Sequence, residues 1–240
     1  MDQVLQIKLV QERKLARCLR GTLTKLIDDW HKTSPYDRQA LIVATDHKLS
    51  QILFAHQNRT SLIVRNRVLP KNHHLHIADS KFLIDSVVKR LIEFEDENTL
   101  KGVFKQRIRK WATRTAIRLT QRDVEEGRWL KAQQNTRGSV FKRWVSRMDG
   151  IERPDHHNAH LRYLAQAIPV NEPFVIGKTA SRLRFPGDTL LGAGPEQTFD
   201  CRCSVEFYDA EGKKIKVDKS DGRKRKRRKK SVRKSHKRPR

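Results

Sequence analysis

The chain has 240 residues, of which 36% are hydrophobic and 33% are charged. Globular chains are usually about 45–50% apolar, so we expect part of this chain to lie outside any hydrophobic core. It contains no apolar run long enough to cross a membrane, and its opening residues lack the apolar segment of a secretory signal. Three cysteines in that setting argue against a disulfide framework. The net charge of +26 predicts a polyanionic partner instead.

Residues 1–137 are predicted to form a helical region. The first segment carries apolar residues at helical spacing, which predicts an amphipathic helix. This stripe consists of Leu15, Cys18, Leu19, Leu23, Leu26, Ile27 and Trp30. Such a face either docks onto a partner or packs against the next helix of the same chain. We favour docking, because no other apolar surface in the sequence is as continuous.

A second helix is predicted to follow a short turn. Ser34 reads as its N-cap and Pro35 as its first helical residue, and the apolar positions over Leu49–Val68 end before Pro70. The polar segment after this proline contains three histidines in four positions, which is compatible with a metal site but more typical of a solvated loop. These histidines are His73, His74 and His76.

Two more helices complete the helical region. Asp79 is the expected cap of a helix whose apolar positions run from Leu83 to Ile92. A long helix is then predicted from about Leu100 to about Gln134, with many arginines and lysines at its exposed positions.

The sequence pattern changes near Gly138. Prolines and glycines now separate short apolar runs, and such runs are typical of strands and loops rather than helices. The runs are Val140–Phe141, Ala167–Val170, Phe174–Ile176, Leu183–Phe185 and Val205–Tyr208. We therefore predict an α+β fold, in which the helical region precedes a small α+β module with short strands over residues 138–210.

Residues 211–240 are predicted to be a disordered basic tail. Residues 213–240 hold 17 lysines and arginines and two aspartates. They contain too few apolar groups for burial to offset the entropy lost when the segment becomes ordered. A solubilising terminus and a nuclear-localisation signal are alternatives, but a block this dense favours contact with nucleic-acid phosphates without base recognition. The residues predicted to contact DNA are Arg223, Lys224, Arg225, Lys226, Arg227, Arg228, Lys229, Lys230, Arg233, Lys234, Lys237, Arg238 and Arg240.

The module contains several short motifs in sequence. FKRWVSRMDGIERPDHHNAH is followed by IPVNEPFVIG, FPGD and FDCRC, and this series resembles the phage Mu F-like domain family of minor head (head morphogenesis) proteins. The matching residues are Trp144, Asp149, Arg153, His156, Glu172, Pro173, Phe174, Pro186, Gly187, Asp188, Cys201, Arg202 and Cys203. The resemblance covers roughly residues 110–208, including RTAIRLTQRDVEEG, which is similar to the helix that leads into the domain.

The resemblance implies a minor head protein that associates with the portal during capsid assembly and supports genome packaging or delivery. It implies portal and capsid proteins as partners, the head interior or portal region of the virion as the location, and the host cytoplasm during assembly. The helical region would then be the arm that contacts the portal, with the Leu15–Trp30 stripe as its docking face. The basic tail would contact packaged double-stranded DNA, and no enzymatic activity is expected.

Cysteines and histidines of the module are candidate ligands of a structural zinc ion. His156 and His160 have the spacing that places two rings on one face of a helix, and Cys201 and Cys203 supply thiolates. In the alternative interpretation, Cys203 packs as a small apolar residue and Cys201 has no specific role.

The charged residues of the motifs have a structural and a catalytic interpretation. Asp149, Arg153 and Asp188 are interpreted as a network of ion pairs and turns, with Asp188 after Pro-Gly as a turn residue. The alternative function is a metal-dependent nuclease that uses the Asp, His and Cys residues. The sequence contains neither a P-loop nor a nucleophile elbow. A plain nucleic-acid-binding protein is a third alternative, which leaves the C-R-C motif unexplained.

Overall fold

The computed structural model describes residues 3–65, 75–93, 97–134, 138–148, 150, 152–199 and 201–217. Asp149 of the predicted motif lies outside these ranges, as do Pro70 and all thirteen predicted DNA-contacting residues between Arg223 and Arg240. His73 and His74 of the histidine-rich segment lie outside them as well.

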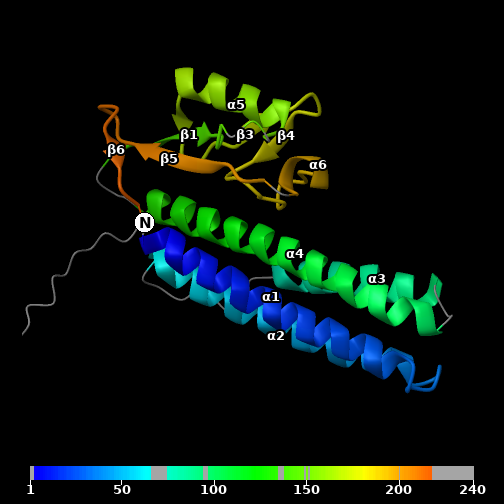
Figure 1. Ribbon diagram of the computed structural model, residues 1–240. Helices are drawn as coiled ribbons and strands as arrows, with labels where there is room; N and C mark the ends of the chain where they lie inside the picture. Colours follow the sequence, from blue (N-terminus) through cyan, green and yellow to red (C-terminus); the bar gives the residue numbers. More distant parts are fainter. Residues whose placement is uncertain are drawn as a thin grey trace, which may run out of the picture.

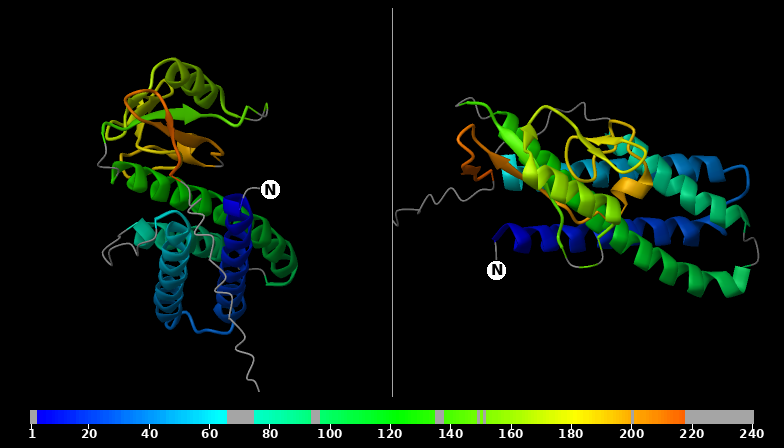
Figure 2. Two further views of the ribbon diagram at one scale, coloured as in Figure 1. Left: turned by 90° about the vertical axis from the view of Figure 1, so that its left-hand side faces the viewer. Right: turned by 90° about the horizontal axis from the view of Figure 1, so that it is seen from above.

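Four long helices form the first half of the chain. They are α1 (Gln3–Trp30), α2 (Arg38–Arg65), α3 (Leu75–Glu93) and α4 (Glu97–Gln133). In Figure 1, α1 and α2 run side by side beneath α4. Figure 2 shows that α4 crosses between the α1–α2 pair and the second half of the chain. The predicted helical region is therefore confirmed, with α4 as its upper layer.

Two helix starts differ from the predictions. The Ser34 hydroxyl oxygen accepts the amide of Asp37 at 3.3 Å, which is the hydrogen bond expected of an N-cap, and the hydroxyl donates to the Asp37 carboxylate at 2.7 Å. The Ser34 carbonyl also accepts this amide at 3.0 Å, so Pro35 and the next two residues form a turn before α2 begins at Arg38. The helix starts after this turn, where the carbonyl of Asp37 accepts the amide of Leu41. Asp79 lies inside α3 and is not its cap.

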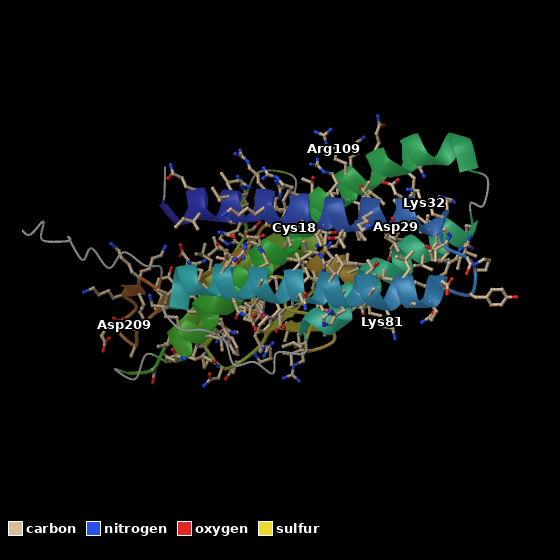
Figure 3. The ribbon with its side chains drawn as sticks, turned by 90° about the horizontal axis from the view of Figure 1, so that it is seen from below. Cys18, Asp29, Lys32, Lys81, Arg109 and Asp209 are labelled. Atoms are coloured by element: carbon tan, nitrogen blue, oxygen red, sulfur yellow. The ribbon has the colours of Figure 1, made fainter. Side chains whose placement is uncertain are left out.

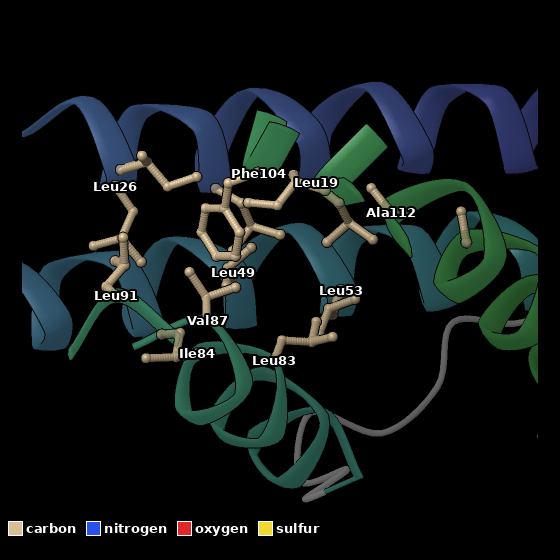
Figure 4. Close-up of a cluster of buried hydrophobic side chains, with 14 of the residues drawn as sticks. Leu19, Leu26, Leu49, Leu53, Leu83, Ile84, Val87, Leu91, Phe104 and Ala112 are labelled. Carbon is tan, nitrogen blue, oxygen red and sulfur yellow. The ribbon is translucent and has the colours of Figure 1, made fainter. Parts of the chain in front are cut away.

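The apolar stripe of α1 is part of an intramolecular core. Leu19 and Leu23 are 0% exposed, and both pack in a cluster that includes residues of α2, α3 and α4 (Figure 4). The prediction that the Leu15–Trp30 stripe docks onto a partner is therefore wrong, because the other helices of the chain already cover it. Burial of each such side chain contributes on the order of 1.5–3 kcal/mol. Cys18, which the stripe included, is exposed.

The second half of the chain forms a layered α+β module above α4. Its elements are β1 (Phe141–Val145), α5 (Pro154–Ala165), β2 (Ile168–Pro169), β3 (Phe174–Ile176), β4 (Ser181–Leu183), α6 (Pro195–Thr198), β5 (Ser204–Tyr208) and β6 (Lys214–Ile215). An antiparallel sheet has the order β2-β1-β5-β6, and β3 pairs with β4 in a separate hairpin. The predicted α+β fold class is confirmed.

The ordered module extends past residue 210, where the sequence pattern places its end. Strand β6 pairs with β5, and Val217 is buried in the module's core. A tight turn joins the two strands: Gly212 has a φ of 77°, and the Asp209 carboxylate accepts the amide of Lys213 at 2.7 Å. The first residues assigned to the tail therefore complete the sheet.

Helix α4 belongs to both halves of the molecule. Gln121 donates to the carbonyl of Cys203 at 2.8 Å, and the Glu125 carboxylate accepts the amide of Val205 at 3.1 Å. One helical turn further on, the indole N–H of Trp129 donates to the Val170 carbonyl at 2.9 Å. These bonds satisfy backbone groups of the module and fix it to the helical layer.

Candidate metal centre

Three ligand atoms from two distant segments meet in the module. The Nδ1 atom of His156 lies 3.5 Å from the Cys203 sulfur and 3.7 Å from the Cys201 sulfur. The three atoms all lie within 4.8 Å of one another, and all three residues are buried. Typical zinc–sulfur and zinc–nitrogen bond lengths in a tetrahedron give a sulfur–nitrogen separation of about 3.6 Å. The group could therefore hold a metal ion.

The start of α5 places His156 in this group. Arg153 has extended backbone angles and precedes Pro154, which suits the first position of a helix because it lacks an amide hydrogen. The Arg153 carbonyl accepts the amides of His156 and His157. Its guanidinium donates to the carbonyl of Phe199, which ties the start of α5 to the segment that leads to the cysteines.

The C-R-C motif presents two sulfur atoms on one side of the chain. Alternate residues of an extended segment point in the same direction, and accordingly Cys201 and Cys203 are buried while Arg202 is exposed. The following residue, Ser204, pairs with Val145 of β1 in the sheet. This register anchors the motif against the strand that carries Trp144.

A chain of hydrogen bonds orients the histidine ring. The His156 Nε2 atom lies 3.1 Å from the side-chain oxygen of Gln197, and the Gln197 amide nitrogen donates to the Asp155 carboxylate at 3.2 Å. Because an amide oxygen only accepts hydrogen bonds, Nε2 must carry the proton in this arrangement. The Nδ1 lone pair then points at the two sulfur atoms, as a metal ligand requires.

A glycine leaves room for this hydrogen-bonded chain. Gly177 has a φ of 71°, and a Cβ atom at this position would lie 2.6 Å from an Asp155 carboxylate oxygen and 2.8 Å from the Gln197 amide nitrogen. Any other residue would therefore displace the pair that orients His156.

The two cysteines hold different protonation states. A hydrogen bond from Cys201 is the main cause that lowers the pKa of Cys203, to about 5, although burial opposes this shift. The hydrogen bond to Cys203 and burial raise the pKa of Cys201 well above its ordinary value. At neutral pH the pair therefore consists of one thiolate and one thiol, and a metal ion that bound both sulfurs would release a proton.

His160 does not join the group, which corrects its prediction as a metal ligand. Its Nδ1 atom lies 3.2 Å from the carbonyl of Trp144. Residues four apart on a helix share a face but are separated by about 6 Å along the axis. His156 reaches the sulfur atoms from the first turn of α5, and His160 contacts the β1 backbone instead.

The aromatic motif residues pack beside the candidate metal centre. The Trp144 ring meets the His156 ring edge-on at 5.4 Å and the Phe174 ring at 5.3 Å between centroids. Tyr163 of α5 contacts Phe174 in the same way. Of the neighbouring motif residues, Glu172 is exposed and Pro173 is partly buried.

The P-G-D motif forms a turn, away from the candidate metal centre, that is held by hydrogen bonds to Asp188. The buried Asp188 carboxylate accepts hydrogen bonds from the Arg184 amide and guanidinium and from the Leu190 amide. Its ion-pair partner is thus Arg184, not Arg153. Pro186 is buried, and Gly187, with a φ of 84°, lies against Arg122 of α4.

Two buried side chains of the module, Gln197 and Lys142, were not predicted from the sequence. Gln197 lies 41 positions after His156, and no spacing rule links an amide in a four-residue helix to that ring. Lys142 is 0% exposed, donates to the Arg184 carbonyl at 2.8 Å and lies 4.5 Å from the Phe174 ring. Burial lowers the Lys142 pKa to about 7. Lys142 lies two residues before Trp144 on β1, so both side chains are expected on the same, inward face of the strand. A lysine is nevertheless rarely expected at a buried position.

Comparison of the chain with models of protein families, with curated proteins and with solved structures finds no match. Among the residues that the structure describes, no helix combines the length and the apolar character needed to cross a membrane.

Proposed function

We propose that this chain is a minor head protein of a bacteriophage whose α+β module is stabilised by a zinc ion. The observation that carries the proposal is the meeting of motif residues that are far apart in the sequence. Trp144 contacts both His156 and Phe174, and His156 contacts Cys203. These residues resemble the Mu F-like family in type and order. Their mutual contacts support the interpretation that the motif series forms one structural unit.

Zinc suits this set of ligands better than other common metals. Thiolate and imidazole donors favour zinc, whereas magnesium and calcium prefer oxygen ligands. His156, Cys201 and Cys203 would supply three ligands, and water or another group would supply the fourth. A bound zinc ion would crosslink α5 to the segment before β5 and so stabilise a module whose strands are short.

The other parts of the chain have separate roles in this proposal. The helical part provides the surface for the portal or capsid protein, through faces other than the buried Leu15–Trp30 stripe. The tail from Arg223 to Arg240 contacts packaged double-stranded DNA, because its lysines and arginines match the nearest polyanion in a phage head.

The head-protein role is tested with particles of a phage whose genome encodes this chain. Mass spectrometry of purified particles should find the chain in far fewer copies than the major capsid protein. Co-expression with the portal protein of the same genome should yield a complex that purifies as one species. Absence of the chain from the particles and from the portal complex would overturn this role.

The zinc site is tested on the purified full-length chain. Elemental analysis should find about one zinc ion per chain, and the Cys203→Ser variant should contain none. Cys18→Ser is the matched control, because Cys18 is exposed and lies on α1; it should retain the metal. Native protein that folds without zinc and gains no stability from added zinc would contradict this part of the proposal.

A metal-dependent nuclease is the competing function. Three protein ligands and a water molecule are the arrangement of catalytic zinc sites, but all three ligand residues here are buried, which argues against access of a DNA substrate to the ion. Plasmid nicking that requires a divalent cation and is abolished by His156→Ala would replace the head-protein role with the nuclease.

A further inference from the structure

Basic side chains of α1 and α4 line a groove on the helical part. The groove has a volume of about 300 Å³ and is lined by Arg13, Arg17 and Arg20 of α1 and by Arg109 of α4. An adjoining hollow of about 530 Å³ shares Arg109 and adds two cations, Lys110 and Arg114. Figure 3 shows Arg109 projecting from α4 beside α1. We name these two hollows together the arginine groove.

The packing of α1 fixes the direction of its arginines. Arg13, Arg17 and Arg20 follow one another at spacings of four and three residues, so they lie on one face of the helix. Leu15 and Leu19, which alternate with them, are buried in the helical core. The arginine row therefore faces solvent and extends over about 10 Å along the helix.

The charge of the groove is not neutralised by the chain. None of its six cations makes an ion pair within the described part of the chain. The acidic residue in its wall, Glu12, faces Lys8 at 3.8 Å. Because like charges repel, six neighbouring cations favour an anionic occupant. The basic tail and the basic faces of a second copy are poor occupants for the same reason.

We propose that the arginine groove binds the phosphate backbone of double-stranded DNA, as a second DNA site separate from the basic tail. One guanidinium group can donate two parallel hydrogen bonds to the oxygens of one phosphate. A row of arginines therefore matches the row of phosphates along a DNA strand. Ala16 and Thr113, between the arginines, are short enough to let a phosphate approach. Neither hollow is lined by an aromatic side chain that could stack on an unpaired base, which favours a duplex over a single strand.

The groove and the tail can act on one duplex. Strand β6, shortly before the described chain ends at Val217, lies at the end of the molecule where α1 begins (Figure 1). The arginine row occupies the middle third of α1, and the tail sequence continues from Val217. This site does not depend on the phage assignment, because it rests on the charge and shape of α1 and α4 alone.

The test compares two full-length variants that each lose three positive charges. The groove variant carries Arg13→Gln, Arg17→Gln and Arg109→Gln. The control carries Lys48→Gln, Lys81→Gln and Lys89→Gln, which are exposed positions on α2 and α3. Binding to synthetic DNA duplexes of two unrelated sequences is measured by fluorescence anisotropy over a series of salt concentrations, after melting curves have established that both variants fold.

The groove variant should reduce the slope of log K against log salt by about 0.9 for each lost phosphate contact, hence by up to about 2.7. The reduction should be equal for both sequences, and the control should retain a slope close to that of the wild type. Equal reductions of this slope in the two variants would show that only net charge matters and would overturn the proposed groove site. An unchanged slope in the groove variant would overturn it as well and would leave an acidic protein as the partner of this face.

Discussion

The apolar cluster that α1 shares with α2, α3 and α4 is mainly aliphatic, whereas the apolar cluster of the module is richer in aromatic rings and surrounds buried polar groups. The helical part also buries polar side chains, such as Gln57 and Glu126 where α2 meets α4, but they lie outside that aliphatic cluster. In the aliphatic cluster, residues such as Leu19 and Leu49 contribute by burial alone, which has no directional requirement. In the module, His156, Lys142 and Asp188 are buried and each depends on particular partners. Buried polar groups stabilise a fold only while their hydrogen bonds are made.

This difference indicates how each region responds to change. The helical part should tolerate exchanges among apolar residues of similar size and fail when a charge enters its core. The module should fail when a single partner is removed, because its strands are short and leave little apolar area to compensate. The substitutions below test this contrast, beginning with the largest expected effect.

A charge in the helical core should prevent cooperative folding. Truncation of a buried leucine to alanine costs about 2–5 kcal/mol, and Leu19→Asp adds the burial of a carboxylate to that loss. Thermal unfolding followed by far-ultraviolet circular dichroism should lose its sharp transition. Cys18→Asp, at the neighbouring exposed position, is the control and should unfold like the wild type. A cooperative Leu19→Asp variant would show that the stripe is not core.

Metal removal should destabilise the module more than the helical part. If zinc is present at about 1,000 times its Kd, chelation should lower the free energy of unfolding by about 4 kcal/mol. The near-ultraviolet signal of Trp144, whose ring contacts His156, should change before the helical signal falls. Simultaneous loss of both signals would indicate that the two regions unfold as one unit.

A methyl group at Gly177 should weaken metal binding without direct contact with the metal. Gly177→Ala would displace the Asp155–Gln197 pair that orients His156, and loss of such support typically reduces metal affinity about 10–100-fold. Gly192→Ala is the matched control, because Gly192 has a φ of 82° but open space at its Cβ position. Both variants carry the strain of a positive φ, so competition with a zinc indicator should separate them. Equal zinc affinities would contradict the role assigned to Gln197.

Burial of Lys142 should make stability depend on pH. The pKa of this lysine is about 7 in the folded chain, against an ordinary value of 10.5. Above pH 7 the unfolded chain therefore binds more protons at this group than the folded chain, so stability should rise with pH by up to about 1.4 kcal/mol per unit. Below the folded pKa both states are protonated and this dependence disappears.

The Lys142→Met variant isolates this contribution. Because methionine does not titrate, urea unfolding between pH 6 and 9 should give a flatter dependence than the wild type. Other groups, including Cys203, titrate equally in both proteins. Parallel curves for the two proteins would show that Lys142 keeps its ordinary pKa.

The sequence by itself determined the parts of the fold that depend on local pattern. Helical periodicity located α1 and α4, and short apolar runs between prolines and glycines located β2, β3 and β5, because local backbone preferences and burial repeat at these intervals. The runs Val140–Phe141 and Leu183–Phe185 overlap β1 and β4 by only one residue each. The C-R-C motif identified Cys201 and Cys203 as a pair for the same reason, since alternate residues of an extended chain share a side. His156 was named through its place in the motif series.

Only the tertiary structure decided what covers each surface and which distant side chains meet. Periodicity shows that the α1 stripe is apolar, but it does not distinguish a partner from α2 and α4 as the covering surface. The choice between His156 and His160 depended on where α5 begins relative to the cysteines. Gln197 lies in the short helix α6 and Gly177 in the turn after β3, and the connections that bring both to the site follow paths that no local rule fixes. Contacts between residues so far apart in sequence follow from packing of the whole chain, and therefore leave little trace in any short segment.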